Sequence, residues 1–303
     1  MAKILVVGSI NMDLVVRVPH SPKPGETVLG GDFETFPGGK GANQAVAAAR
    51  MGGEVTMVGR VGNDDFGNTL IQGLVEDKIK TTHVIKDSKA RTGVAMISVA
   101  ADGENMIVVA SGANAKVSVE DVGNTRSLMR ETDLLLVQLE CPLETVIAAI
   151  ELAKAYGVPV VLNPAPAQPL PKSLLRNVDY LTPNQNELLI LTGEAKLNDG
   201  IGKIKKWGLR NLIITLGANG ARVISDGIDQ HLPAHEITAV DTTAAGDAFN
   251  GALAVALAEG KQLLEAVSYG MAAGALASTK RGAQPSLPTR DAVENLLASQ
   301  NRA

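Results

Sequence analysis

Short apolar runs alternate with helical patterns along most of this chain, and that alternation constrains the fold more than any other feature. The apolar runs span 3–10, 55–61, 134–139, 158–162 and 212–216. Helical patterns, Ala-rich or with apolar residues three and four apart, cover 42–51, 66–75 and 143–156. Strands that alternate with helices predict an α/β fold with a mostly parallel sheet covered on both faces. In such a sheet, ligands bind beyond the carboxyl ends of the strands.

Two stretches interrupt the alternation. Residues 14–36 contain several prolines and short β-prone pieces, and residues 93–110 indicate a hairpin that turns at Asp102-Gly103. An isolated hairpin is only marginally stable, so we expect these pieces to pack on the α/β body or on a second subunit. We therefore predict one domain, 1–303, with a small inserted β lid formed by about 14–36 and 93–110.

Composition excludes several classes of protein. The net charge is -4 and aromatic residues make up 3%, which argues against a protein that mainly binds nucleic acid. One cysteine allows no internal disulfide and no Cys-based zinc site. No apolar run approaches the ~20 residues of a membrane helix, and Asp13 comes too early for a signal peptide. We expect a cytoplasmic protein with neither a membrane nor a nucleic-acid partner.

Familiar motifs give mainly negative information. A Walker A loop fails because Gly41, not Ser or Thr, follows Lys40, and no G-x-G-x-x-G follows a strand. His231 and His235 are four apart, but the proline between them argues against a helical zinc pair. Cys141 has no His nearby in sequence, and we interpret it as a small buried hydrophobe.

The most informative segment is DTTAAGDAFNG. Ala244, Ala245 and Gly246 lie at the predicted start of a helix, where free N–H groups and the helix dipole form an anion site. Asp247 lies at the rim of that site and could accept the proton of an attacking hydroxyl, mainly by orienting it. The alternative is structural: Asp247 complements the helix N-terminus and Asp241 forms a turn.

A second segment, PGGKGANQ, precedes the Ala-rich helix. Its glycines let the chain approach a ligand closely, and Lys40 and Asn43 can hydrogen-bond hydroxyl groups. The alternative is a Gly-rich connector whose lysine is solvated.

Polar residues also end two buried strands. Asn11 and Asp13 follow the first apolar run, and Glu140 ends DLLLVQLE. Carboxylates that accept from vicinal hydroxyls are a simple way to hold a sugar. The alternative for each residue is capping of a strand end.

Two further segments could meet a nucleotide. In TPNQNE, Glu187 could hold waters of a Mg²⁺ carried by a nucleotide, although Asn184 and Glu187 also match a helix capping box. In TLGANG, the glycines could line a nucleotide or simply form a tight turn.

Together these segments resemble the ribokinase-like carbohydrate kinases. The resemblance covers essentially the whole chain and keeps the motif order GSINMDLV, PGGKGANQAVAAAR, SGANA, VQLE, NPAPA, TPNQNE, TLGANG, DTTAAGDAFNG and KRGAQPS. It implies a three-layer α/β sandwich whose inserted lid pairs with its twin, so that the protein is a homodimer.

The resemblance also implies residue roles. Sugar-binding residues would be Asn11, Asp13, Gly39, Lys40, Asn43 and Glu140. Asp247 would be the catalytic base and would also contact the substrate, with Ala244, Ala245 and Gly246 as the anion hole. The ATP site would comprise Asn184, Thr215, Gly217, Ala218, Asn219, Gly220 and Gly246, with Glu187 serving Mg²⁺ through water. A monovalent cation, usually K⁺, would bind Asp241, Thr243, Ala277, Lys280, Gly282 and Ser286.

The activity implied by the resemblance is ATP-dependent phosphorylation of the 5-hydroxyl of D-ribose, giving D-ribose 5-phosphate and ADP. A kinase of the same family acting on deoxyribose, another sugar or a nucleoside is an alternative. A sugar or nucleotide sensor without activity is a further alternative, but it predicts loss of the base or of the anion-hole glycine. Asp247 and Gly246 are both present.

Overall fold

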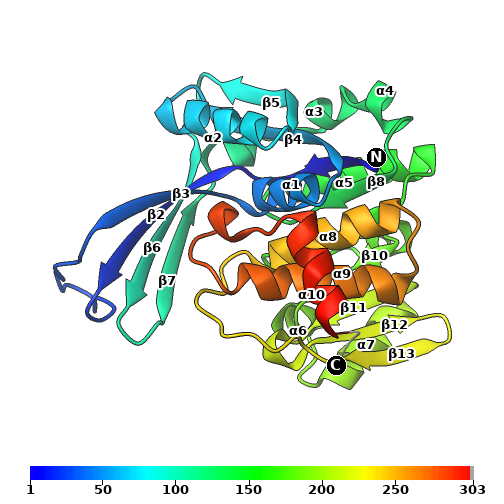
Figure 1. Cartoon of the computed structure of the whole chain (residues 1–303). Coiled ribbons are helices and arrows are strands. Elements are labelled where there is room, and N and C mark those ends of the chain that lie inside the picture. Colours follow the sequence, from blue (N-terminus) through cyan, green and yellow to red (C-terminus); the bar gives the residue numbers. More distant parts are fainter. Residues whose placement is uncertain (301–303) are drawn as a thin grey trace.

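A nine-stranded sheet runs through the body of the computed structural model, which describes residues 1–300 (Figure 1). The last three residues of the predicted domain 1–303 lie outside the described residues. The strand order is β13-β12-β11-β10-β9-β8-β1-β4-β5. In chain order the strands are β1 (Lys3–Val7), β4 (Glu54–Gly62), β5 (Lys80–Asp87), β8 (Leu134–Val137), β9 (Val160–Leu162), β10 (Tyr180–Leu181), β11 (Asn211–Thr215), β12 (Ala221–Ser225) and β13 (Ile228–Leu232).

The pairs from β5 to β11 are all parallel, which confirms the mostly parallel sheet expected from the alternating pattern. The two strands at the other edge, β12 and β13, are antiparallel. Only a short turn joins β11 to β12, and a parallel neighbour would need a crossover of a dozen residues or more. The chain therefore has to return antiparallel at this edge.

Helices cover both faces of the sheet, so the body has three layers (Figure 1). Ile4 and Val6 pack with residues of α1, α8, α9 and α10 on one face. Leu5 and Val7 pack with residues of α5, α6 and α7 on the other. The helices are α1 (Lys40–Arg50), α2 (Asp65–Glu76), α3 (Val119–Gly123), α4 (Arg126–Met129), α5 (Leu143–Tyr156), α6 (Gln185–Thr192), α7 (Leu197–Lys206), α8 (Ala245–Ala258), α9 (Leu263–Ala277) and α10 (Arg290–Gln300).

A second, four-stranded sheet projects from one side of the body, and we call it the lid sheet (Figure 1). Its order is β3-β2-β6-β7, formed by β2 (Asn11–Val18), β3 (Phe33–Gly38), β6 (Gly93–Ala100) and β7 (Asn105–Ala110). β6 and β7 form the hairpin expected from the sequence. β2 pairs parallel to β6, which joins two segments that are about 80 residues apart into one sheet.

Helices α1 and α8 pack closely, and small residues make this possible. A β-carbon added at Gly251 of α8 would lie 2.4 Å from the β-carbon of Ala47 and 2.8 Å from the backbone nitrogen of Ala48. Only glycine therefore fits at position 251. The close packing brings the first turns of the two helices together at the carboxyl end of the sheet.

Among the described residues, none of the helices combines the length and the apolar character that a bilayer-spanning segment needs.

Candidate active site

Asp247 lies in the first turn of α8 and is buried, with 6% of its surface exposed. Two amides from the first turn of α1 hydrogen-bond its carboxylate. Asn43 Nδ2 donates to Oδ2 over 2.9 Å, and Gln44 Nε2 donates to Oδ1 over 2.9 Å. Donors of this kind favour the ionised carboxylate, so the arrangement suits a group that accepts a proton.

Glu140 lies just beyond β8 and is held by two donors from neighbouring elements. Its Oε2 accepts from the hydroxyl of Ser9 and, over 3.0 Å, from the backbone N–H of Lys40. The carboxylate is therefore fixed where β1, β8 and α1 meet. This is the carboxyl edge of the sheet, where the sequence predicted a ligand site.

Asn11 and Asp13 belong to the lid sheet, and the expectation that they end the first strand is wrong. β1 ends at Val7, and both residues lie in β2. The chain makes its last bond to the large sheet where the N–H of Gly8 donates to the carbonyl of Val58, and it then leaves to form β2. Two of the residues expected to bind the sugar therefore belong to the lid sheet, and the others belong to the body.

Two glycines allow close approach at this junction. Gly39 has φ 87°, and a β-carbon there would lie 2.7 Å from the backbone nitrogen of Asn11. A β-carbon at Gly38 would lie 2.3 Å from Asp13 Oδ2, so this carboxylate rests against bare backbone. The Gly-rich segment is thus where the start of α1 and the lid sheet come into close contact.

Four carboxylates, those of Asp13, Glu140, Glu187 and Asp247, share one electrostatic environment around Lys40. Burial, and then repulsion by Glu140 and Asp247, raises the pKa of Asp13 to about 7. Burial also raises the pKa of Asp247, although Lys40 and the two amide donors oppose it. Burial alone would lower the pKa of Lys40, but the surrounding carboxylates outweigh burial and raise it. The ammonium group therefore stays charged among acidic neighbours.

The helix start predicted at 244–246 is confirmed. Ala244 is the N-cap of α8 and adopts a left-handed conformation with φ 58° and ψ 10°. Gly246 is exposed, and a β-carbon at that position would meet nothing within 4 Å. N–H groups in the first turn of a helix have no intrahelical acceptor. The N–H of Ala245 donates to the carbonyl of Thr242 over 3.2 Å, so the exposed Gly246, beside Asp247, carries the candidate anion-binding N–H.

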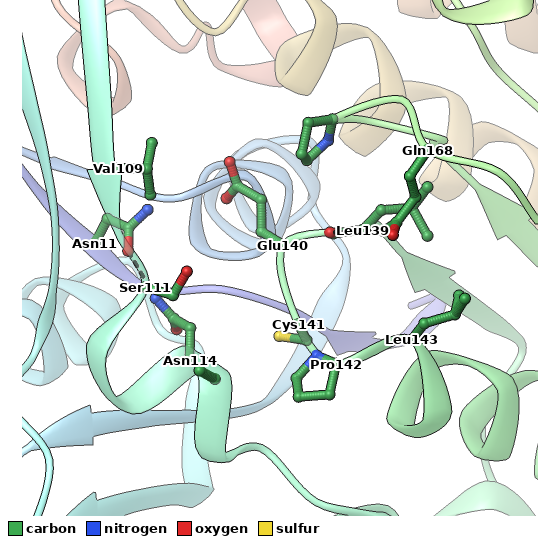
Figure 2. A pocket seen from close by; sticks show the side chains of 12 residues that line it. Asn11, Val109, Ser111, Asn114, Leu139, Glu140, Cys141, Pro142, Leu143 and Gln168 are labelled. Atoms are coloured by element: carbon green, nitrogen blue, oxygen red, sulfur yellow. Dashed lines mark hydrogen bonds between the residues drawn. The ribbon is translucent and has the colours of Figure 1, made fainter. Parts of the chain in front are cut away.

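A hollow of about 410 Å³ opens beside Glu140. Figure 2 shows Glu140 pointing into it across from Asn11 and Val109, the latter from strand β7 of the lid sheet. Asn114 Nδ2 donates to Asn11 Oδ1 over 2.6 Å and so orients that amide. The hollow is lined by Asn11, Val109, Ser111, Asn114, Ala115, Leu139, Glu140, Cys141, Pro142, Leu143, Pro166 and Gln168. Burial raises the pKa of the Cys141 thiol to about 12, consistent with its interpretation as an inert small side chain.

The residues expected to meet a nucleotide lie at the ends of neighbouring strands. Asn184 and Thr215 form an isolated parallel bridge, and the N–H of Thr215 donates to the carbonyl of Pro183 over 3.0 Å. The expected glycine turn follows as a short 3₁₀ helix, Gly217–Asn219, in which Gly217, Ala218 and Asn219 are exposed. Gly220 is buried with φ 86°, and a β-carbon there would collide with the carbonyl oxygen of Leu232.

Asn184 and Glu187 form the capping box that the sequence left open as an alternative. Asn184 Oδ1 accepts from the N–H of Glu187 over 2.8 Å, and Glu187 Oε2 accepts from the N–H of Asn184 over 2.7 Å. Burial raises the pKa of Glu187, which also lies within electrostatic reach of Lys40 and Asp247. The capping bonds therefore hold the Glu187 carboxylate at the edge of the site.

A second hollow of about 440 Å³ lies between the end of β13, α9 and α10. Met271 lines it together with Leu232, Pro233, His235, Glu265, Ser268, Tyr269 and Leu297. His231, on the neighbouring strand β13, makes a 2.6 Å hydrogen bond to the carbonyl oxygen of Asn219 in the exposed glycine turn. The hollow is therefore next to the segment expected to line a nucleotide.

Three of the six residues expected around a monovalent cation are joined by hydrogen bonds. Asp241 Oδ1 accepts from the N–H of Thr243 over 2.9 Å and from its hydroxyl, and Asp241 Oδ2 accepts from the N–H of Gly282 over 3.0 Å. Burial alone would raise the pKa of Asp241, but these bonds outweigh it and lower that pKa. The carboxylate is ionised, as a cation ligand needs to be.

The other three are close in sequence around the same segment. The carbonyl of Ala277 accepts from the N–H of Lys280, and Ser286 is fully buried with its hydroxyl bonded to the carbonyl of Ala283. No group of three or more His, Cys, Asp or Glu side chains that could hold a metal ion occurs in the described part of the chain.

Sequence reasoning missed three site residues that lie inside motifs it quoted. Ser9 of GSINMDLV bonds Glu140, Gln44 of PGGKGANQ bonds Asp247, and Asn114 of SGANA bonds Asn11. Each hydrogen-bonds a candidate site residue, and of the three only Asn114 also lines the hollow. The available signal was their position, because each follows or precedes a strand end in a motif that carries candidate ligands.

A family model for the pfkB family carbohydrate kinases matches residues 1–290. The chain belongs to the PfkB family of carbohydrate kinases. This confirms the resemblance found in the sequence.

Relatives of this PfkB-family kinase agree over nearly their full length. It is 45% identical to ribokinase from Haemophilus influenzae, over 96% of this chain and 97% of that protein. It is 37% identical to deoxyribokinase from Salmonella typhi, over 97% of this chain and 98% of that protein. The solved structure of Arabidopsis thaliana ribokinase complexed with ribose and ATP superimposes with a TM-score of 0.90 at 34% identity, covering 98% and 99% of the two chains. The ribokinase-like fold is thereby confirmed.

Proposed function

We propose that this PfkB-family kinase transfers the terminal phosphoryl group of ATP to the 5-hydroxyl of D-ribose, giving D-ribose 5-phosphate and ADP. The observation that carries the proposal is the juxtaposition of a buried, hydrogen-bonded Asp247 with the open helix start at Gly246. A base and an anion site in contact are what phosphoryl transfer to an alcohol requires. Similarity to ribokinases supports ribose as the acceptor.

In the proposed reaction, Asp247 hydrogen-bonds the 5-hydroxyl and accepts its proton as the oxygen attacks phosphorus. The transition state of phosphoryl transfer is loose, so the hydroxyl loses its proton late and the carboxylate mainly orients it. First-turn N–H groups of 244–246 stabilise the negative charge on the phosphoryl oxygens. Exposed Gly246 lets the phosphoryl group come close to the backbone.

The sugar hydroxyls are held from two sides. Asn11 and Asp13 approach from the lid sheet, and Gly39, Lys40, Asn43 and Glu140 approach from the body. A polar site that pairs each hydroxyl discriminates strongly against a sugar that lacks one, because its own buried polar groups would be left unpaired.

The proposed nucleotide site extends from the anion turn to the second hollow. The phosphates of ATP lie near Asn184 and Gly246, and its adenine lies toward Met271. The ribose moiety of ATP lies between them, along Thr215, Gly217, Ala218, Asn219 and Gly220. Mg²⁺ keeps much of its water, so the Glu187 carboxylate would hold it through water and help to neutralise the phosphates.

The proposed monovalent cation, K⁺ in the first instance, is held by Asp241, Thr243, Ala277, Lys280, Gly282 and Ser286. These residues flank the turn that begins α8. A cation there would orient the turn whose N–H groups meet the phosphate. The backbone N–H groups of Thr243 and Gly282 both donate to the Asp241 carboxylate, which holds the loop before α8 against the loop after α9.

We further propose that the protein works as a cytoplasmic homodimer joined through the lid, which spans about 14–36 and 93–110. The apolar side chains of β7 support this, because Met106, Ile107, Val108 and Val109 are between 49% and 61% exposed. An edge strand with such side chains is open to pairing with a second copy.

One comparison of rates tests the substrate. Values of kcat/KM for ribose, 2-deoxyribose, fructose and pseudouridine, each with ATP and Mg²⁺, should be highest for ribose. A preference for 2-deoxyribose would instead favour the specificity of the Salmonella relative. Absence of ATP consumption with every sugar would overturn the kinase assignment and favour a sensor.

A further inference from the structure

Three buried amide side chains, which the proposed reaction does not use, lie behind Asp247. Gln44, Gln138 and Asn163 are 0%, 1% and 7% exposed. Gln44 lies in α1, whereas Gln138 and Asn163 directly follow β8 and β9. Burial of three amides at the carboxyl edge of the sheet is costly unless their donors and acceptors are paired.

Gln44 is the hub of this group. Its Nε2 donates to Asp247 Oδ1 over 2.9 Å and to Asn163 Oδ1 over 3.0 Å, which uses both of its donors. Its Oε1 accepts from Gln138 Nε2 over 2.6 Å. Both N–H groups of Gln44 and one of the two lone pairs of its oxygen are therefore engaged in hydrogen bonds.

From Asn163 the hydrogen bonds continue to the anion turn. Asn163 Nδ2 donates to the carbonyl of Thr182 over 3.0 Å, and the Thr182 hydroxyl donates to Asn250 Oδ1 over 2.6 Å. Asn250 Nδ2 then donates to the carbonyl of Gly246 over 2.8 Å. Gly246 and Asp247 are adjacent in the chain. The hydrogen bonds and this peptide link therefore close a ring that joins the Asp247 carboxylate to the backbone of the proposed anion site.

The orientation of each amide in this ring follows from its neighbours. A main-chain carbonyl only accepts, so the carbonyls of Thr182 and Gly246 fix the NH₂ groups of Asn163 and Asn250. Asn163 must then present its oxygen to Gln44. An ionised Asp247 also needs a donor. The NH₂ group of Gln44 must therefore face both Asp247 and Asn163. Its oxygen then faces Gln138, whose NH₂ group donates to it.

Space for Gln138 comes from a glycine. A β-carbon at Gly8, just after β1, would lie 2.2 Å from Gln138 Oε1. Only a residue without a side chain permits Gln138 to reach Gln44 at this strand end. The amide group is therefore accommodated by the backbone of the sheet itself.

We propose that Gln44, oriented by Gln138 and Asn163, is a positioning residue that holds the Asp247 carboxylate in its reactive orientation and in register with the anion turn. The proposal rests on the proposed function. Gln44 acts through Asp247, and Asn43, which bonds the other oxygen, cannot replace it, because one hydrogen bond leaves the carboxylate free to rotate. The ring also prevents the carboxylate and the turn from moving independently.

The principal test is Gln44→Met, which keeps the length of the side chain and removes the amide. We expect kcat to fall by about tenfold to a hundredfold, the effect of losing a hydrogen bond to a charged group. KM for ribose and for ATP should stay within about twofold, because Gln44 contacts neither ligand. The acid limb of the kcat–pH profile should move to higher pH, because Asp247 loses a donor that favours its ionised form.

Gln138→Met is the second variant. Gln138 reaches Asp247 only through Gln44, so the fall in kcat and the shift of the acid limb should have the same direction and be smaller. Thr145→Val is the matched control, because the Thr145 hydroxyl donates to the carbonyl of Val117, is fully buried and lies in α5, outside the ring. It should lower Tm without moving the pH profile. An equal pH profile in Gln44→Met and wild type would overturn the proposal.

A readout independent of activity separates this proposal from the proposed function. Titration of ¹³C-labelled aspartate carboxyls by NMR, with the Asp247 signal assigned by its loss in Asp247→Asn, gives the Asp247 pKa without any substrate. A higher Asp247 pKa in Gln44→Met than in wild type supports the positioning role even if ribose is not the substrate. An unchanged pKa refutes that role even if ribose is phosphorylated.

Discussion

The proposed sugar side and the proposed nucleotide side of the site are built in different ways. Around Asp247, the buried amides of Asn43 and Gln44 hydrogen-bond the carboxylate. Around the anion turn, Thr242, Thr243 and Gly246 are exposed, and Val240 is 55% exposed. We therefore expect side chains of the protein to fix the proposed base and ligands to complete the proposed phosphate site.

Substitution of the base should have the largest effect on this comparison. Asp247→Asn removes the proton acceptor and keeps its shape, so kcat should fall by about 10²–10⁴-fold. Initial-rate kinetics with ribose and ATP provide the measurement. Asp65→Asn is the matched control, because Asp65 also lies in the first turn of a helix, α2, but is exposed. If both variants kept wild-type kcat, Asp247 would be only a helix-capping charge.

Replacement of the monovalent cation tests the other side. If ligands complete the anion turn, turnover in tetramethylammonium should be about tenfold lower than in K⁺, because the turn loses an orienting charge. Rates should be measured at constant ionic strength, with ribose and ATP saturating. Equal rates in the two salts, with trace alkali metal removed, would show that the turn is as preformed as the base.

The preformed sugar side should carry a cost in stability that depends on pH. The pKa of Asp13 in the folded protein, about 7, is above its ordinary value of 3.8. The folded state therefore binds more protons, and stability falls as pH rises from about 4 to 7. Asp13→Asn should raise Tm at pH 8 by roughly 5 °C and have much less effect at pH 5. Differential scanning calorimetry without ligands provides the measurement.

Asp121→Asn gives the control with the opposite sign. Burial alone would raise the pKa of Asp121, but hydrogen bonds from Arg60 and Ser118 outweigh it and lower that pKa. Loss of this carboxylate should therefore lower Tm at pH 8. If Asp13→Asn also lowered Tm at pH 8, the ionised Asp13 would be stabilising and the expected cost would be refuted.

The smallest effect is expected where the two sides meet. Ala244 has φ 58°, a left-handed conformation that a β-carbon makes unfavourable by about 1 kcal/mol. Ala244→Gly should raise the free energy of unfolding by about 0.5 kcal/mol once the added flexibility of the unfolded chain is deducted. Ala258→Gly, at the regular end of α8, should lower it by about 0.5–1 kcal/mol. Urea unfolding distinguishes the two signs.

Much of the fold could be predicted because buried parallel strands are continuous apolar runs. The run at 134–139 corresponds to β8, whose four residues are all buried. β5, with the sequence KTTHVIKD, and β13, with IDQHL, lie at the sheet edges and carry polar side chains, so no apolar run revealed them. A continuous run of apolar residues reflects a strand that is buried on both faces, and edge strands are only half buried.

The site was predictable where a residue type implies chemistry, as for Asp247 and Glu140. The amides around Asp247 were not, because Gln44 and Gln138 are 94 positions apart and each alone could be a cap. No spacing rule links them, since only the order of strands in the sheet brings their positions together. The location of Asn11 and Asp13 was missed for a related reason, because nothing in GSINMDLV marks where one sheet ends and the next begins.

The glycine at the crossing of α1 and α8 has a consequence for how this enzyme can vary. Gly251 touches no candidate ligand, yet a single added methyl group would push α8 away from Ala47. The separation of α1 and α8 at this crossing sets the distance between Asp247 of α8 and the amides of Asn43 and Gln44 in α1. Residues remote from any substrate can thus act as spacers, and their tolerance to change is governed by catalytic alignment as much as by stability.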